Sequence, residues 1–157
     1  MSEAAIDAPA PGFSLPATGD RTIDLAGLRG SSVVLFFYPK ASTPGCTREG
    51  QAFRDLHDAF REAGTVILGI SRDGLKAQEN FRAKYDFPFP LLCDTDETAC
   101  RAYDVLREKN LYGKKVMGVE RSTFLIDAEG VLRREWRDVK VDGHAEEVLE
   151  AVRALGQ

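Results

Sequence analysis

Cys46 is the residue best placed for chemistry, and it follows Thr43 and Pro44 in a short loop sequence. Pro44 suits the first position of a helix, because its missing N–H would have no partner there. Thr43 is then the N-cap, and Cys46 lies in the first turn. Backbone N–H groups in that turn lack partners and the helix dipole is positive there, so a thiolate is stabilised. Cys46 is therefore a candidate nucleophile; the alternative is a cysteine that lies near a helix start without a function.

The flanking sequence predicts a strand before this loop and a helix after it. Residues 33–37 form the most apolar run of the chain, which indicates a buried strand. Phe53, Leu56 and Phe60 share one stripe of a helix that we expect to end near Gly64. The other expected elements are an N-terminal hairpin of residues 13–15 and 22–25, strands at 66–70 and 91–93, helices at 75–85, 94–103 and 145–155, a loop at 106–119, and a hairpin of 122–126 with 131–136.

Composition and charge exclude several classes of protein. The 157 residues suit one domain, and no segment approaches the roughly 20 apolar residues that span a bilayer. The net charge of −4 argues against nucleic-acid binding. Three cysteines without paired spacing do not suggest a disulfide framework, and the cysteines and two histidines show no zinc-ligand spacing, so we expect no metal and no cofactor. Residues 1–10 lack the features of a signal peptide, so we expect a cytoplasmic protein.

The residues around Cys46 resemble a known family. Pro39, Thr43 and Cys46 follow the pattern P-x-x-x-T-x-x-C, which is similar to the peroxidatic motif of the peroxiredoxins. The string FFYPKASTPGCTREGQAFRDL resembles the bacterioferritin comigratory protein branch, also called peroxiredoxin Q. A distant segment, GVERSTFLID, resembles the one that carries the family's active-site arginine, here Arg121; ILGISRD and FPFPLLCDTD resemble two further family strands.

The resemblance implies a thioredoxin-like α/β fold, in which a mixed central sheet is flanked by helices and carries an N-terminal hairpin. We expect residues 1–157 to form one such domain, with residues 1–11 as a flexible tail. The order of the predicted elements fits this fold, because early strand–helix–strand units are followed by a late hairpin and a terminal helix. The implied activity is that of an antioxidant thiol peroxidase, which reduces hydrogen peroxide and organic hydroperoxides.

The resemblance also assigns roles within the site. Cys46 would attack the peroxide, Thr43 would present its hydroxyl to thiolate and peroxide, and Arg121 would stabilise the negative charge. Pro39 would shape the loop and shield the thiolate from water. Each residue has a simpler alternative. Thr43 acts only as an N-cap, Pro39 only ends a strand, and Arg121 pairs on the surface with Glu120 or Glu49.

Two residues are expected to support this site. Glu49 lies one turn after Cys46 and would orient Arg121, although a first-turn carboxylate also needs no such role. The backbone N–H of Gly45, like that of Cys46, would donate to the reacting group. His57 does not fit the base of a cysteine–histidine hydrolase, because it lies roughly 16 Å along the helix from Cys46. We expect His144 to be solvated or to cap the last helix.

The sequence departs from the family at the step that reduces the oxidised cysteine. The two positions that usually hold a resolving cysteine carry Gln51 and Arg82. Cys93 and Cys100 are the remaining candidates, and both are expected to be buried structural residues. We therefore expect a one-cysteine mechanism in which thioredoxin, glutaredoxin or glutathione reduces the sulfenic acid of Cys46. The expected assembly is a monomer or a weak homodimer that binds neither nucleic acid nor membrane.

Two other functions fit part of the pattern. A thiol–disulfide oxidoreductase of the thioredoxin type would need C-x-x-C, but Thr47, Arg48 and Glu49 follow Cys46. It would also need a proline before the strand that faces the cysteine, where this chain has Arg121. A peroxide sensor or holdase, in which oxidation of Cys46 exposes a binding surface, is compatible with the sequence as a second activity.

Overall fold

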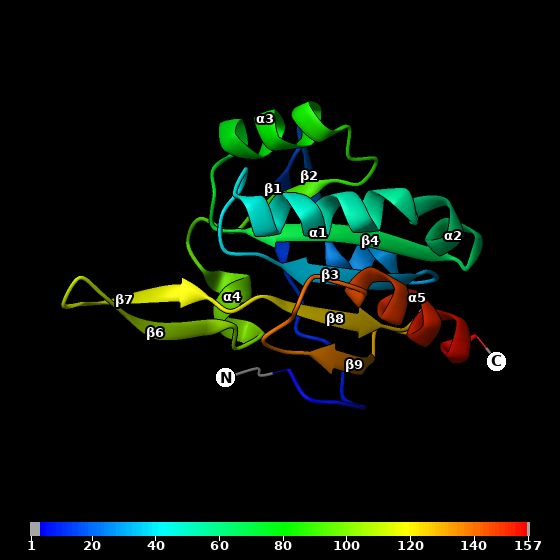
Figure 1. Cartoon of the computed structure of the whole chain (residues 1–157). Coiled ribbons are helices and arrows are strands. Elements are labelled where there is room, and N and C mark those ends of the chain that lie inside the picture. Colours follow the sequence, from blue (N-terminus) through cyan, green and yellow to red (C-terminus); the bar gives the residue numbers. More distant parts are fainter. Residues whose placement is uncertain (1–3, 157) are drawn as a thin grey trace.

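The computed structural model describes residues 4–156 and contains a seven-stranded sheet in the order β2-β1-β5-β4-β3-β8-β9 (Figure 1). Beside it lies a separate two-stranded sheet of β6 (Leu106–Leu111) and β7 (Lys114–Val119). The strands of the large sheet are β1 (Ser14–Ala17), β2 (Arg21–Asp24), β3 (Ser32–Phe37), β4 (Thr65–Ser71), β5 (Leu91–Cys93), β8 (Ser122–Ile126) and β9 (Leu132–Trp136). The helices are η1 (Leu25–Leu28), α1 (Pro44–Asp55), α2 (His57–Glu62), α3 (Leu75–Tyr85), α4 (Thr98–Ala102) and α5 (His144–Leu155). This architecture confirms the expected mixed sheet flanked by helices.

Strand β3 has apolar residues on both of its faces, because both faces of the sheet are covered. Val33, Leu35 and Phe37 belong to the core beneath η1 and α4. Val34, Phe36 and Tyr38 alternate with them and belong to the core on the other face, which includes side chains of α1, α2, α3 and α5. The continuous apolar run of residues 33–37 is thus the pattern of a central strand, since alternate side chains point to opposite faces.

The pairing of the central strands brings distant parts of the chain to one edge of the sheet. β3 runs parallel to β4, and β4 runs parallel to β5. β8 runs antiparallel to β3, with Phe37 opposite Ser122. Consequently one end of the sheet brings together the last residues of β3 and β4 and the first residues of β8.

The helix that we expected from Pro44 to Gly64 is divided in two. α1 ends at Asp55, Leu56 leaves helical geometry, and α2 follows at once. Gly64 has φ +70° and ends the second helix, as expected. α1 packs closely on the loop before β5, since a Cβ atom at Gly50 would lie 2.4 Å from the ring of Phe87. Only glycine allows this approach.

The expected loop at residues 106–119 was wrong: it is the antiparallel hairpin of β6 (Leu106–Leu111) and β7 (Lys114–Val119). Tyr112 and Gly113 connect the strands with φ angles of +52° and +79°, as in a two-residue hairpin turn. Most of its side chains are exposed on both faces, so the sequence lacks the alternation of apolar and polar residues that usually indicates a strand. The hairpin projects from the body of the protein (Figure 1).

The N-terminal segment, part of the expected flexible tail, runs along β9 where the structure describes it. Asp7 N–H donates to the carbonyl of Leu132 at 2.7 Å, and Ala10 N–H donates to that of Gly130 at 2.9 Å. Residues 1–3 of the expected tail lie outside the described residues. Within residues 4–156, none of the helices has the length and apolar character needed to cross a membrane.

The expectation that His144 is solvated or caps α5 was wrong. It is the first residue of α5, and only 5% of it is exposed. Its Nε2 atom lies 2.8 Å from the hydroxyl oxygen of Thr123, and its ring packs edge-on against Phe53 and Trp136. Apolar neighbours from α1 and β9 close over the imidazole, and the isolated residue gave no sequence signal for them.

We expect His144 to make the protein less stable in acid. Burial lowers the pKa of His144 from 6.5 to about 4. Between these pH values the imidazole is protonated in the unfolded chain but neutral in the folded chain. This contribution to stability is present above pH 6.5 and is lost as the pH falls toward 4. The variant His144→Gln should therefore show a smaller difference in free energy of unfolding between pH 7 and pH 5 than the wild type. Urea denaturation at both pH values measures this difference; equal pH dependence in wild type and His144→Gln would contradict the prediction.

Candidate active site

Cys46 lies in the first turn of α1, as predicted. Thr43 is the N-cap residue, with the extended backbone angles φ −90° and ψ 156°, and Pro44 begins the helix. Only 1% of Cys46 is exposed, so its thiol is buried at the edge where β3 ends. In the part of the chain that the structure describes, the N–H groups of Gly45 and Cys46 donate to no protein acceptor. They remain available to a reacting group.

Arg121 joins Cys46 to Glu49. Its Nη2 atom lies 3.6 Å from the Sγ atom of Cys46, and its Nη1 atom donates to Glu49 Oε1 at 2.7 Å. Burial opposes the charge of Arg121, but Glu49 and Cys46 nevertheless raise the pKa of the guanidinium above its ordinary value. The guanidinium therefore stays charged beside the thiol.

Glu49 is a buried carboxylate with a single polar side-chain partner, Arg121, among residues 4–156. Only 1% of its side chain is exposed, and among the described residues its second oxygen, Oε2, has no hydrogen-bond partner. Burial raises the pKa of Glu49, and Arg121 opposes the rise. A buried carboxylate is costly unless it is paired, so Glu49 holds the guanidinium in place and is held by it.

Gly45 is needed for the close approach of Arg121. A Cβ atom at this position would lie 2.9 Å from Arg121 Nη2, closer than a side chain tolerates. Glycine thus gives the guanidinium room beside the first turn of α1. The supporting role that we expected for the Gly45 backbone did not include this steric role.

Thr43 and Pro39 belong to the loop that leads from β3 into α1. The hydroxyl of Thr43 donates to the carbonyl of Lys40 at 2.7 Å. No hydrogen bond from α1 reaches this side chain within the described residues, so Thr43 caps by position and not by its hydroxyl. Pro39 is half-buried directly after Tyr38, and no polar contact within residues 4–156 links it to Cys46.

The other two cysteines are buried thiols. Cys93 ends β5, and burial raises the pKa of its thiol, with smaller contributions from Asp73 and Glu79. Cys100 lies in α4, where burial and then Asp94 raise the pKa of its thiol far above the usual range. All three cysteines are free.

Gln51 and Arg82, which occupy the two positions usual for a resolving cysteine in the resembled family, lie on different helices. Gln51 is half-buried in α1. Arg82 is half-buried in α3 and donates from Nε to the carbonyl of Phe89 at 3.3 Å. Neither side chain can form a disulfide with Cys46.

Asp73, which was not predicted from the sequence, contacts the loop between β3 and α1. Its Oδ2 atom accepts a hydrogen bond from the N–H of Ala41 at 2.8 Å. Asp73 lies two residues after the end of β4, and β4 is parallel to β3. Carboxyl ends of parallel strands meet at one edge of a sheet, so this position was the available signal.

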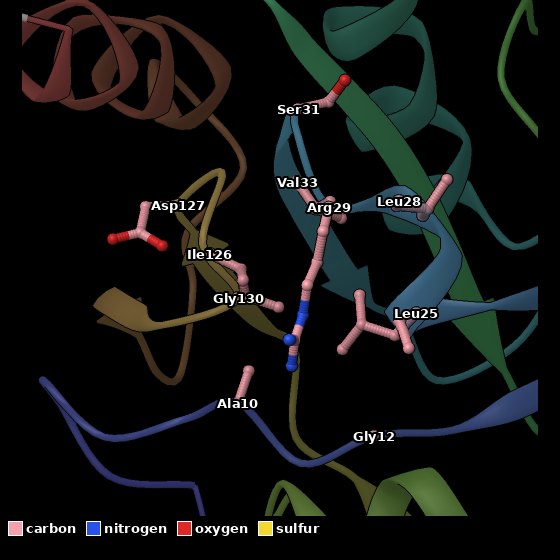
Figure 2. A pocket seen from close by; sticks show the side chains of 11 residues that line it. Ala10, Gly12, Leu25, Leu28, Arg29, Ser31, Val33, Ile126, Asp127 and Gly130 are labelled. Carbon is pink, nitrogen blue, oxygen red and sulfur yellow. The ribbon is translucent and has the colours of Figure 1, made fainter.

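Two hollows lie at opposite ends of the sheet. One, of about 350 Å³, is lined by Gly45 and Arg121 together with residues of the segment before α5. The other, of about 130 Å³, is lined among others by Val33 near the beginning of β3 and by Ile126, the final residue of β8. Figure 2 shows this second hollow, with the side chain of Arg29 extending across it beside Gly130. Pro39, Thr43 and Cys46 do not line this second hollow. We therefore place the candidate active site at the end of the sheet that carries Gly45 and Arg121.

The chain is similar to known proteins over nearly its whole length. Residues 6–135 match the model of the AhpC/TSA family. The chain belongs to this family. It is 51% identical over 156 residues to Peroxiredoxin Bcp of Xanthomonas campestris pv. campestris, which covers 98% of each chain. It is 43% identical to Peroxiredoxin Bcp of Bacillus subtilis over 148 residues, or 94% of each chain.

A solved structure agrees with these relatives. The bacterioferritin comigratory protein of Xanthomonas campestris, described as having alkyl peroxide reduction activity, superposes with a TM-score of 0.92 and 48% identity, covering 99% of this chain and 100% of that one. The thioredoxin-like peroxiredoxin fold and the resemblance to the peroxiredoxin Q type are thereby confirmed. The protein is a thiol-dependent peroxidase.

Proposed function

We propose that Cys46 is the thiol that reduces the peroxide. The thiolate attacks one oxygen of the peroxide, a sulfur–oxygen bond forms and the oxygen–oxygen bond breaks. Cys46 is oxidised to sulfenic acid, and the peroxide is reduced to an alcohol or water once the departing oxygen takes up a proton. The observation that carries the proposal is the half-buried Arg121 guanidinium, whose Nη2 lies 3.6 Å from the Cys46 sulfur.

Arg121 and the first turn of α1 would stabilise the charge that moves to the departing oxygen. The guanidinium has donors beside the thiol, and the N–H groups of Gly45 and Cys46 are without protein acceptors among residues 4–156. Donors fixed in place before the reaction stabilise such a charge more strongly than water does. Thr43 would hold the peroxide through the lone pairs of its hydroxyl oxygen, while its proton is engaged by Lys40. Pro39 would shield the thiolate from water.

We infer that both hydrogen peroxide and organic hydroperoxides are substrates. The alkyl peroxide reduction activity described for the Xanthomonas campestris relative supports the organic substrates. The hollow of about 350 Å³ beside Arg121 and Gly45 supports them too, because it offers space next to the guanidinium. The whole chain, residues 1–157, would act as one domain, as a monomer or a weak homodimer.

An external thiol would return Cys46 to its reduced form. The thiol condenses with the sulfenic acid, which gives a mixed disulfide and water, and a second thiol then releases Cys46. The raised pKa values of Cys93 and Cys100 make both poor nucleophiles, which supports a one-cysteine mechanism. Thioredoxin, glutaredoxin and glutathione all supply the required chemistry.

We expect one equivalent of hydrogen peroxide to leave Cys46 as sulfenic acid and not in an internal disulfide. Dimedone traps sulfenic acids, so the protein should gain one trap molecule, located on the peptide that contains Cys46. Intact mass and peptide mapping under non-reducing conditions measure both outcomes. The double variant Cys93→Ser, Cys100→Ser is the control, and it should give the same yield of trapped product. A quantitative disulfide between Cys46 and Cys93 or Cys100 would overturn the one-cysteine mechanism.

A further inference from the structure

A chain of buried polar side chains holds the loop that precedes Cys46. At the end of β3, the hydroxyl of Tyr38 donates to Gln78 Oε1 at 2.6 Å. Gln78 Nε2 donates to the hydroxyl of Ser71 at 2.9 Å and to the carbonyl of Leu92 at 2.8 Å. Tyr38, Ser71 and Gln78 are all fully buried. Because every member is satisfied by a partner, the orientation of each side chain is fixed.

Asp73 connects this chain to the loop. Its Oδ2 atom accepts two hydrogen bonds, one from the N–H of Ala41 at 2.8 Å and one from the hydroxyl of Ser71 at 2.7 Å. The N–H of Asp73 donates to Ser71 Oγ at 3.2 Å, which fixes the carboxylate from its own backbone. One oxygen atom thus joins the loop to the end of β4.

Ala41, which Asp73 holds, precedes Ser42, whose backbone is strained. Ser42 has φ +64°, a left-handed backbone conformation that residues with a side chain rarely adopt. Such conformations persist only where the surrounding structure holds them. On one side of Ser42, Ala41 is held by its hydrogen bond to Asp73. On the other side lies Thr43, the N-cap residue of α1. Any release of Ala41 lets this strained loop relax.

We infer that Asp73 is a positioning residue for peroxide reduction. It does not meet the peroxide itself; through Ala41 it fixes the loop that presents Thr43, Gly45 and Cys46 to the substrate. The inference rests on the proposed role of Cys46. A shift of the loop would misalign the peroxide with the thiol, and a misplacement of about 1 Å can slow a reaction on the order of 100-fold.

Three variants of Asp73 separate position from charge. Asp73→Asn removes the charge but can place its carbonyl oxygen where Oδ2 now accepts both hydrogen bonds. Asp73→Ala removes the charge and the acceptor. Asp73→Glu keeps the charge but moves the oxygen atoms by the length of one methylene group. We expect the second-order rate of Cys46 oxidation by hydrogen peroxide to fall about tenfold or more in the Ala and Glu variants and to stay near the wild-type rate in the Asn variant.

A second measurement distinguishes positioning from a general loss of structure. Alkylation of Cys46 by iodoacetamide needs no alignment of a peroxide, so it should not slow in the Ala and Glu variants. Glu150→Ala, which removes an exposed carboxylate of α5, should leave both rates unchanged. Should Asp73→Ala fail to fold, the Glu and Asn variants still decide the question.

The inference is overturned if the Ala and Glu variants react with peroxide as the wild type does. It is equally overturned if Asn is as slow as Ala while Glu is fast, because the charge would then matter and not the hydrogen bonds. Cys46→Ser is measured alongside. If that variant still consumes peroxide, the proposed function fails and the inference fails with it; if it is inactive while Asp73→Ala is normal, only the inference fails.

Discussion

Cys46→Ser should abolish peroxide consumption. A serine alkoxide is inaccessible near neutral pH, so the variant lacks a nucleophile even though its side chain is almost the same size. The loss should extend to hydrogen peroxide and to an organic hydroperoxide such as cumene hydroperoxide. Turnover is followed as loss of peroxide in the presence of excess dithiothreitol, which needs no partner protein.

The controls for Cys46→Ser are the corresponding serine variants of the other two cysteines, Cys93 and Cys100. Cys93→Ser and Cys100→Ser should each oxidise at nearly the wild-type rate in the first step, because the pKa of each of these thiols is raised and neither contacts Arg121 in the described structure. Equal peroxide consumption by wild type and Cys46→Ser would show that another group carries the activity. Circular dichroism confirms that each variant is folded.

Arg121→Ala should slow the reaction of Cys46 with peroxide by about 100-fold or more, the cost of losing one preorganised donor in other enzymes. The variant removes the guanidinium beside the sulfur and leaves Glu49 buried without its partner. Arg121→Lys keeps a positive charge, but one ammonium group lacks the planar fork that reaches both Cys46 and Glu49. We therefore expect the Lys variant to be intermediate, as measured by stopped-flow oxidation with excess hydrogen peroxide.

Arg48→Ala is the matched control for the arginine. Arg48 lies in α1 two residues after Cys46, lines the same hollow as Arg121 and pairs with Asp142 at 3.0 Å, but it is exposed. Its removal should change the rate of oxidation little, because exposed ion pairs contribute little. A wild-type rate in Arg121→Ala, or an equal loss in Arg48→Ala, would remove Arg121 from its proposed role.

Local sequence patterns predicted the elements that carry the site. The apolar run at residues 33–37 indicated β3, and Thr43-Pro44 indicated the start of α1, so Cys46 could be placed in its first turn. The hairpin of β6 and β7 was missed because its charged and apolar residues are exposed on both faces. Strand prediction depends on one face being buried, and this hairpin has no buried face over most of its length.

The partners of Cys46 were harder to predict than its position. Arg121 was found only through the family resemblance, since no local pattern shows that the beginning of β8 lies beside the end of β3. The steric role of Gly45 depends on where the guanidinium lies, and the burial of His144 depends on Phe53 and Trp136. These features arise from contacts between distant residues, so the neighbouring sequence does not contain them.

The insertion of β8 between β3 and β9 has a consequence for the chain during its synthesis. Arg121 contacts a cysteine that precedes it by 75 residues, and β8 covers one long edge of β3. A nascent chain that ends before residue 121 carries Cys46 without its guanidinium, and β3 then has an open edge. Because the N-terminal part of a protein leaves the ribosome first, the complete peroxide site is assembled late, after most of the sheet has been translated.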